Sequence, residues 1–203
     1  MSQNIAEMLQ QIQVLSPADL GDLACRWDIG PAALKPLLLE ELSRREQLYF
    51  SFGLNMHLGR LQQRIAASNT QVVGVAKLNN YRVAFDLPKG KNNQTNADAV
   101  ANLRPELGEV VWGVLYWLPE GQVDRLDTVE SALGYQVHVE TVEASHIGAL
   151  KAHFYMLRGR GAVETAPSPE YQNNLLQGAL EQGLPTSYIE RLRDKLASLP
   201  AAL

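Results

Sequence analysis

The chain has 203 residues, of which 46% are hydrophobic and 20% are charged. This length suffices for one main hydrophobic core and leaves little room for a second. Lys and Arg number 18 against 22 Asp and Glu, and the resulting net charge of −4 argues against a nucleic-acid-binding surface.

Membrane and secretion signals are missing from the sequence. No window approaches the roughly 18 consecutive apolar residues of a membrane-spanning helix. The N-terminus lacks the basic start and apolar run of a secretory signal. We therefore expect a cytoplasmic protein that does not bind a membrane.

Few residues could hold a metal ion or a cofactor. Cys25 is the single cysteine, which excludes an internal disulfide framework and any multi-cysteine metal site. The four histidines do not pair on one predicted element, and the familiar dinucleotide, phosphate-loop, zincin and hydrolase motifs are absent. We expect neither a metal nor a cofactor.

Residues 1–46 have the pattern of short helices. Apolar residues recur at helical spacing, and Ser16 before Pro17 is a typical helix start. We interpret these residues as an N-terminal helical extension that packs on a main domain formed by residues 47–203. A surface for a protein partner is the alternative interpretation, since an apolar stripe does not tell an internal mate from an external one.

The period then changes to that of strands. Residues 48–52 predict a short aromatic strand that breaks at Gly53 and leads into a helix. Residues 72–78 and 81–87 predict two strands joined by a hairpin turn at Asn79-Asn80, because Asn tolerates positive φ. Residues 89–99 predict a polar loop.

The remaining elements complete an α+β pattern. Strands are expected at residues 109–118, 135–142 and 149–157, with a helix at 121–133 between the first two. Two short helices follow Pro167 and close the chain. Because the strands and helices lack a regular βαβ alternation, the α+β class is favoured.

Glu130 is the candidate catalytic residue that helical periodicity selects. It follows Leu126 by four residues and Val123 by seven, so it falls on the apolar face that Leu133 also marks. A carboxylate turned towards a core has a raised pKa, which suits a general acid or base near neutral pH. The alternative is a glutamate at the helix rim that reaches solvent or pairs with an arginine.

The strand-turn-helix at Gly53 is a second candidate. Exposed N–H groups at such a turn, assisted by the helix dipole, attract a carboxylate. The alternative is a glycine needed only for steric reasons.

Several motifs, in order, resemble the gamma-glutamylcyclotransferase family. Residues 49–56 resemble its tyrosine-glycine-serine-asparagine loop, and residues 111–116 its central strand. Residues 126–130 resemble the helix that carries its catalytic glutamate. The segment from Pro167 to Tyr188 resembles the tail of the animal-type enzymes, so the likeness spans residues 48–199.

This resemblance implies a small mixed β-barrel with flanking helices and a pocket for a γ-glutamyl amino acid or amine. The implied reaction forms 5-oxoproline and releases the amine, which would place the chain in glutathione metabolism. Glu130 would move the protons, and the loop at Gly53, Leu54 and Asn55 would hold the glutamyl end. Tyr155 matches a family tyrosine near the glutamate. Ring closure within one molecule needs positioning more than a protein nucleophile.

The sequence departs from the family pattern at two loop positions. Phe52 stands where the family has tyrosine and Leu54 where it has serine, so side-chain hydroxyls are lost there while backbone donors remain. An inactive family member that acts as a binding or regulatory module through residues 1–46 is therefore an alternative. Cyclisation of a γ-glutamyl amine, or removal of a γ-glutamyl group from a larger molecule, is another. A homodimer and a protein partner of residues 1–46 stay open.

Overall fold

The computed structural model describes residues 47–86, 99–119, 121–145, 148–157 and 164–201. The predicted N-terminal extension, residues 1–46, and the predicted loop up to residue 98 lie outside the described residues. No helix within the described ranges is long and apolar enough to cross a membrane.

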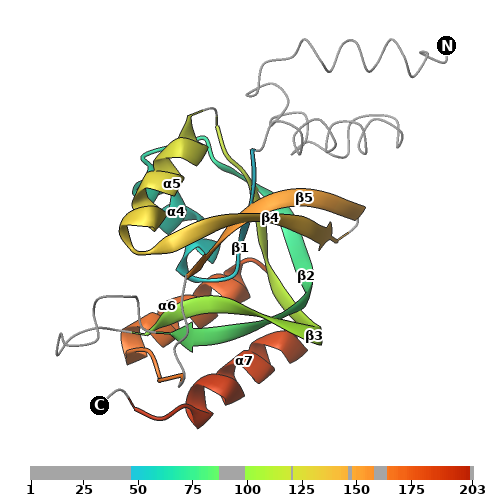
Figure 1. Cartoon of the computed structure of the whole chain (residues 1–203), viewed down its shortest axis with the longest axis vertical. Coiled ribbons are helices and arrows are strands. Elements are labelled where there is room, and N and C mark those ends of the chain that lie inside the picture. The colour runs from blue at the N-terminus through green and yellow to red at the C-terminus, as the bar shows by residue number, and fades with distance from the viewer. Residues whose placement is uncertain (1–46, 87–98, 120, 146–147, 158–163, 202–203) are drawn as a thin grey trace.

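Five strands close into a barrel in the order β1-β3-β2-β4-β5 (Figure 1). Neighbouring strands are antiparallel except β1 and β5, which run parallel where Tyr49 lies beside His153. The barrel is therefore mixed, and the predicted α+β class is confirmed. The strands are β1 (Leu48–Ser51), β2 (Gln71–Asp86), β3 (Val100–Trp117), β4 (Tyr135–Ala144) and β5 (Gly148–Leu157).

Helices flank this barrel in two groups. The short 3-10 helix η1 follows β1 and leads into α4, which lies beside α5 at one side of the barrel (Figure 1). At the other side, α6 packs against η1 and α7. The bounds are η1 (Leu54–Met56), α4 (Leu58–Ile65), α5 (Gln122–Ala132), α6 (Pro169–Glu181) and α7 (Thr186–Ser198).

The predicted hairpin at Asn79-Asn80 is wrong, because β2 continues through both residues. Asn80 does adopt a positive φ of 63°, but it lies within the strand at a register shift, where residues 106–109 of β3 face it alone. The register with β3 shifts there: Asn79 pairs with Val110 and Tyr81 with Pro105. Both halves of β2 pair with the long β3 strand, and the β2–β3 ladder bends between them (Figure 1).

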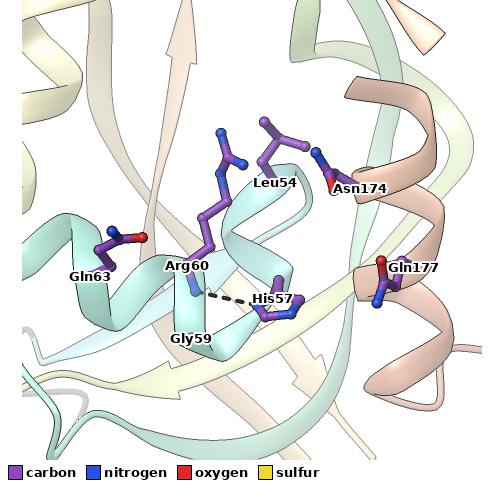
Figure 2. Close-up of a pocket in the computed structure, with 7 residues that line it drawn as sticks. All are labelled: Leu54, His57, Gly59, Arg60, Gln63, Asn174 and Gln177. Carbon is purple, nitrogen blue, oxygen red and sulfur yellow. Dashed lines mark hydrogen bonds between the residues drawn. The ribbon is translucent and has the colours of Figure 1, made fainter. Parts of the chain in front are cut away.

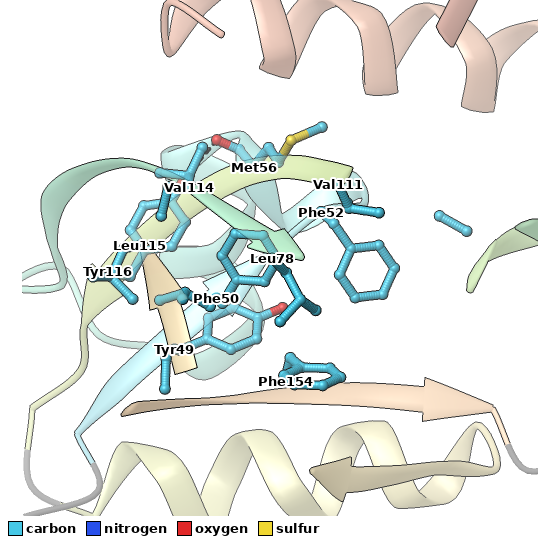
Figure 3. Packing of buried hydrophobic residues seen from close by; sticks show 14 of the residues in the cluster. Tyr49, Phe50, Phe52, Met56, Leu78, Val111, Val114, Leu115, Tyr116 and Phe154 are labelled. Atoms are coloured by element: carbon cyan, nitrogen blue, oxygen red, sulfur yellow. Dashed lines mark hydrogen bonds between the residues drawn. The ribbon is translucent and has the colours of Figure 1, made fainter. Parts of the chain in front are cut away.

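β1 and β3 approach each other closely in the barrel. All four residues of β1 are buried. A Cβ atom on Gly113 of β3 would lie 2.2 Å from the carbonyl oxygen of Ser51 and 2.8 Å from the ring of Phe50, so only glycine fits. Figure 3 shows the aromatic rings of β1 within the apolar cluster that fills the barrel.

Polar contacts join the C-terminal helices to the barrel. The carboxylate of Glu164 accepts hydrogen bonds from the Arg82 guanidinium and, at 3.1 Å, from the Phe85 N–H, and it lies 3.0 Å from the Lys195 ammonium of α7. The hydroxyl of Tyr171 in α6 accepts a 2.7 Å hydrogen bond from the Ala101 N–H of β3. Both helices are thus fixed to the β2–β3 ladder.

Candidate active site

Glu130 lies on the buried face of α5, as helical periodicity predicts. The residue is 5% exposed and Leu126, one turn earlier, is fully buried. Leu133 does not share this face: it follows the helix as its C-cap and is 37% exposed. Of the carboxylates on α5, Glu130 is thus buried, Asp127 is half-buried and Asp124 faces solvent.

The Glu130 carboxylate meets one side chain from η1 and one from α4. The amide of Asn55 donates to its Oε1 at 3.2 Å. The guanidinium of Arg64 lies 3.2 Å from the same oxygen. The structure therefore combines the two sequence interpretations, since Glu130 is turned into the core and also paired with an arginine.

Burial governs the ionisation of Glu130. Loss of solvation raises the pKa of its carboxyl above the ordinary value, although the charge of Arg64 and the hydrogen bond from Asn55 pull the pKa partly back. A carboxyl group with a pKa raised in this way suits a general acid or base better than an exposed glutamate does.

Tyrosines surround this carboxylate. The Asn55 amide also donates to the hydroxyl of Tyr49 at 3.1 Å. Burial, with the nearby Glu130 charge second, raises the pKa of Tyr49, and burial likewise raises the pKa of Tyr135. Tyr155, the predicted substrate-binding tyrosine, donates a 2.5 Å hydrogen bond to Asp127, and its ring centroid lies 5.8 Å from that of Tyr49. These phenols stay protonated at neutral pH and present neutral hydroxyls.

The structure separates the predicted loop residues. Asn55 reaches Glu130, whereas Phe52 is buried beside Phe50 in the core. A Cβ on Gly53 would make only an ordinary contact, 3.5 Å from Ala101. Glycine is therefore not required at this turn for space. The N–H groups of Leu54 and Asn55 belong to the first turn of η1, which supplies them with no acceptor.

Leu54 points to a different place from its neighbour Asn55. Its side chain lines a pocket of about 270 Å³ between α4 and α6. Figure 2 shows Leu54 beside Arg60, with Asn174 facing them from α6. The Leu54 side chain therefore points into this pocket and not towards Glu130. The seven residues that line this pocket are Leu54, His57, Gly59, Arg60, Gln63, Asn174 and Gln177.

His153 on β5 is a buried neutral imidazole next to this site. It is 4% exposed and its ring stacks on Tyr49 with centroids 5.4 Å apart. Burial lowers the pKa of His153 to about 4, and the Asp127 charge offsets only part of the effect. Below the ordinary pKa of 6.5 an unfolded chain binds this proton and the folded chain does not.

We expect the His153→Phe variant to resist acid better than the natural chain. Between pH 6.5 and about 4 the natural chain loses folding free energy as pH falls, by up to about 3 kcal/mol from this residue. The phenyl ring keeps the stacking surface but cannot titrate. Urea unfolding at pH 7 and pH 4.5 measures the difference, and an equal loss in both proteins would contradict the assignment.

Sequence reasoning missed Arg64, Tyr49 and His153. The pattern of α4 placed Leu61 and Ile65 inward but gave no sign that the arginine between them meets a carboxylate 66 positions later. Tyr49 was included only as the first residue of the loop motif, and His153 carried only the signal of an apolar strand. Within the described ranges, no group of three or more His, Cys, Asp or Glu side chains could hold a metal ion.

Comparison with known proteins places this chain in a family. The model of the AIG2-like family matches residues 110–192. The gamma-glutamylcyclotransferase of Homo sapiens is 31% identical over 151 residues, which cover 72% of this chain and 77% of the relative. The chain belongs to the gamma-glutamylcyclotransferase family. The protein of that name from Bos taurus is 30% identical over 149 residues, covering 71% of this chain and 76% of the relative.

Solved structures agree with this membership. A structure titled gamma-glutamyl cyclotransferase superposes with a TM-score of 0.66 at 25% identity, covering 76% of this chain and 88% of that chain. The family resemblance and the barrel fold expected from the sequence are confirmed. The homologues support the gamma-glutamylcyclotransferase enzyme class for this chain.

Proposed function

We propose that this protein cyclises a γ-glutamyl amino acid or amine to 5-oxoproline and releases the amine, with Glu130 as the general acid and base. The observation that carries the proposal is the buried Glu130 carboxylate, held by the Asn55 amide of the loop that follows β1. The names of the similar proteins support the same reaction class.

The reaction needs proton transfer and positioning only. Glu130 takes a proton from the α-ammonium, and the freed amine attacks the γ-carbonyl carbon of the same molecule. The bond from that carbon to the leaving nitrogen then breaks. Of the three ammonium protons, one stays on the lactam nitrogen. The other two pass in turn through Glu130 to the leaving nitrogen, so the amine departs and Glu130 ends as a carboxylate. Holding both reactants in one molecule supplies the proximity that such a step requires.

The loop and the phenols would orient the substrate in this scheme. The N–H groups of Leu54 and Asn55 would contact the glutamyl end. Tyr49 and Tyr155 would border the site as neutral hydroxyls, because burial raises the pKa of both. The Phe52 side chain, which is buried in the core, would act through packing.

Incubation of the purified full chain with γ-L-glutamyl-L-alanine tests the proposal. We expect 5-oxoproline and alanine in equal amounts, detected by mass spectrometry, above a control without protein. A panel of γ-glutamyl amines would then identify the released group. Release of glutamate in place of 5-oxoproline would show hydrolysis, and no product from any γ-glutamyl compound would favour a binding module; either outcome contradicts the proposal.

A further inference from the structure

Two buried polar atoms beside the Glu130 carboxylate have no hydrogen-bond partner among the residues that the structure describes. They are Nε of Arg64, a donor, and Oδ1 of Asn55, an acceptor. The same two side chains contact Glu130 through other atoms: Nη2 of Arg64 and Nδ2 of Asn55 each lie 3.2 Å from Glu130 Oε1. Buried polar groups nearly always have a partner, so this donor and this acceptor are available to a ligand that carries both functions.

The charges at this place are also paired in a specific way. Arg64 contributes a cation and Glu130 an anion, in contact with one another. The α-carbon of a γ-glutamyl group carries the complementary pair, an ammonium and a carboxylate on neighbouring bonds. The ammonium matches Glu130 and the Asn55 oxygen. The carboxylate matches the guanidinium, whose forked donors suit two carboxylate oxygens.

We infer that Arg64 binds the α-carboxylate of the γ-glutamyl substrate while Glu130 faces its α-ammonium. The Arg64–Glu130 ion pair is then exchanged for two ion pairs with the substrate. The inference takes its substrate class from the proposed function and adds the residue that selects the α-amino acid head group.

Exposure supports Arg64 as the residue that receives the carboxylate. Its side chain is 23% exposed, against 6% for that of Glu130, so solvent reaches the cation more readily than the acid behind it. The N–H groups of η1 are uncharged. Arg64 therefore supplies a formal positive charge that these amides lack, and breaking the pair with Glu130 also frees the carboxylate to take a proton.

The test compares two substrates in matched variants of the full chain. One substrate is γ-L-glutamyl-L-alanine, and the other is the same dipeptide with its glutamyl α-carboxylate converted to a carboxamide. We expect the natural protein to prefer the carboxylate in kcat/KM by roughly tenfold or more, as hydrogen bonds to charged groups imply. Arg64→Gln should reduce this preference to within about threefold, while Arg64→Lys, which keeps the charge, should retain part of it.

Arg60→Gln is the matched control, because Arg60 lies one turn earlier on α4 and lines the separate pocket beside Leu54. It should leave the preference unchanged. If Arg64 has a merely structural role, Arg64→Gln would lower kcat/KM for both substrates equally and keep their ratio. That result would overturn the inference. Thermal unfolding of each variant verifies the fold, and Arg64→Lys keeps the test decisive if Arg64→Gln does not fold.

Binding separates this inference from the proposed function. The γ-sulfonamide analogue of the dipeptide cannot be cyclised, so calorimetry measures its affinity without turnover. A carboxylate preference that disappears in Arg64→Gln supports the inference even if the protein forms no 5-oxoproline. Equal affinity of the natural protein for the carboxylate and carboxamide analogues overturns it, whatever the turnover.

Discussion

Replacing Glu130 with glutamine should lower kcat/KM for a γ-glutamyl dipeptide by about 10²–10⁴-fold, the usual contribution of a general acid and base. Glutamine has nearly the same shape and can still accept from Asn55 and Arg64, but it cannot take a proton. Steady-state kinetics with detection of 5-oxoproline measures the loss, and circular dichroism verifies that the fold is kept.

Asp124→Asn is the control for this experiment. Asp124 lies on the same helix but faces solvent, so removing its charge should leave turnover within about twofold. Turnover that persists in Glu130→Gln would remove Glu130 from the mechanism. A similar loss in both variants would point to a general charge effect on α5.

The same residue predicts how activity depends on pH. A base must be ionised, so kcat/KM should fall as pH decreases through the pKa of Glu130. Burial raises that pKa above the ordinary glutamate value, although Arg64 and Asn55 oppose the shift. The acidic limb of the pH profile should therefore lie above the pH at which an exposed glutamate titrates, and a limb at or below that pH would contradict a buried base.

Gly113→Ala should be the most damaging single-methyl change in the barrel, with a loss of about 3 kcal/mol of unfolding free energy. The new Cβ would lie 2.2 Å from a backbone oxygen of Ser51, which no rotamer change can relieve. β1 and β3 would have to separate. Urea unfolding monitored by tryptophan fluorescence measures the loss.

Gly53→Ala provides the matched comparison. The added methyl there would lie 3.5 Å from the Cβ of Ala101, an ordinary contact, and the φ of −118° is accessible to alanine. Stability should change by less than about 1 kcal/mol. If Gly113→Ala were as stable as Gly53→Ala, the close approach of β1 to β3 would be wrong.

Local patterns were enough to predict most elements of the fold. The helices α5, α6 and α7 and the strands β1, β4 and β5 carry their periods and breaks in the sequence. The hairpin prediction at Asn79-Asn80 failed because these residues permit a turn and an irregular strand equally well. The choice depends on pairing with β3, which lies far away in the sequence. Local signals contain no information on such partners.

The candidate site divides along the same line. Helical periodicity alone predicted that Glu130 faces inward, because the buried face is a property of a single helix. Its contact with Arg64 requires α4 and α5 to come together, although β2 and β3 separate these two helices in the sequence. Asn55 was expected from a motif, but its hydrogen bond to Glu130 required the closed barrel. The family resemblance supplied what periodicity could not, namely the reaction class.

The bend in the β2–β3 ladder has a consequence for how the molecule loses its structure. One half of the ladder closes the barrel that carries Glu130, and the other half, through Phe85 and Ala101, holds α6 and α7. The same two strands therefore belong to both parts, and no seam separates them within the described residues. Detachment of the C-terminal helices would therefore open strands that also belong to the barrel beside Glu130. We expect partial unfolding at the tail to lower activity before the barrel itself unfolds.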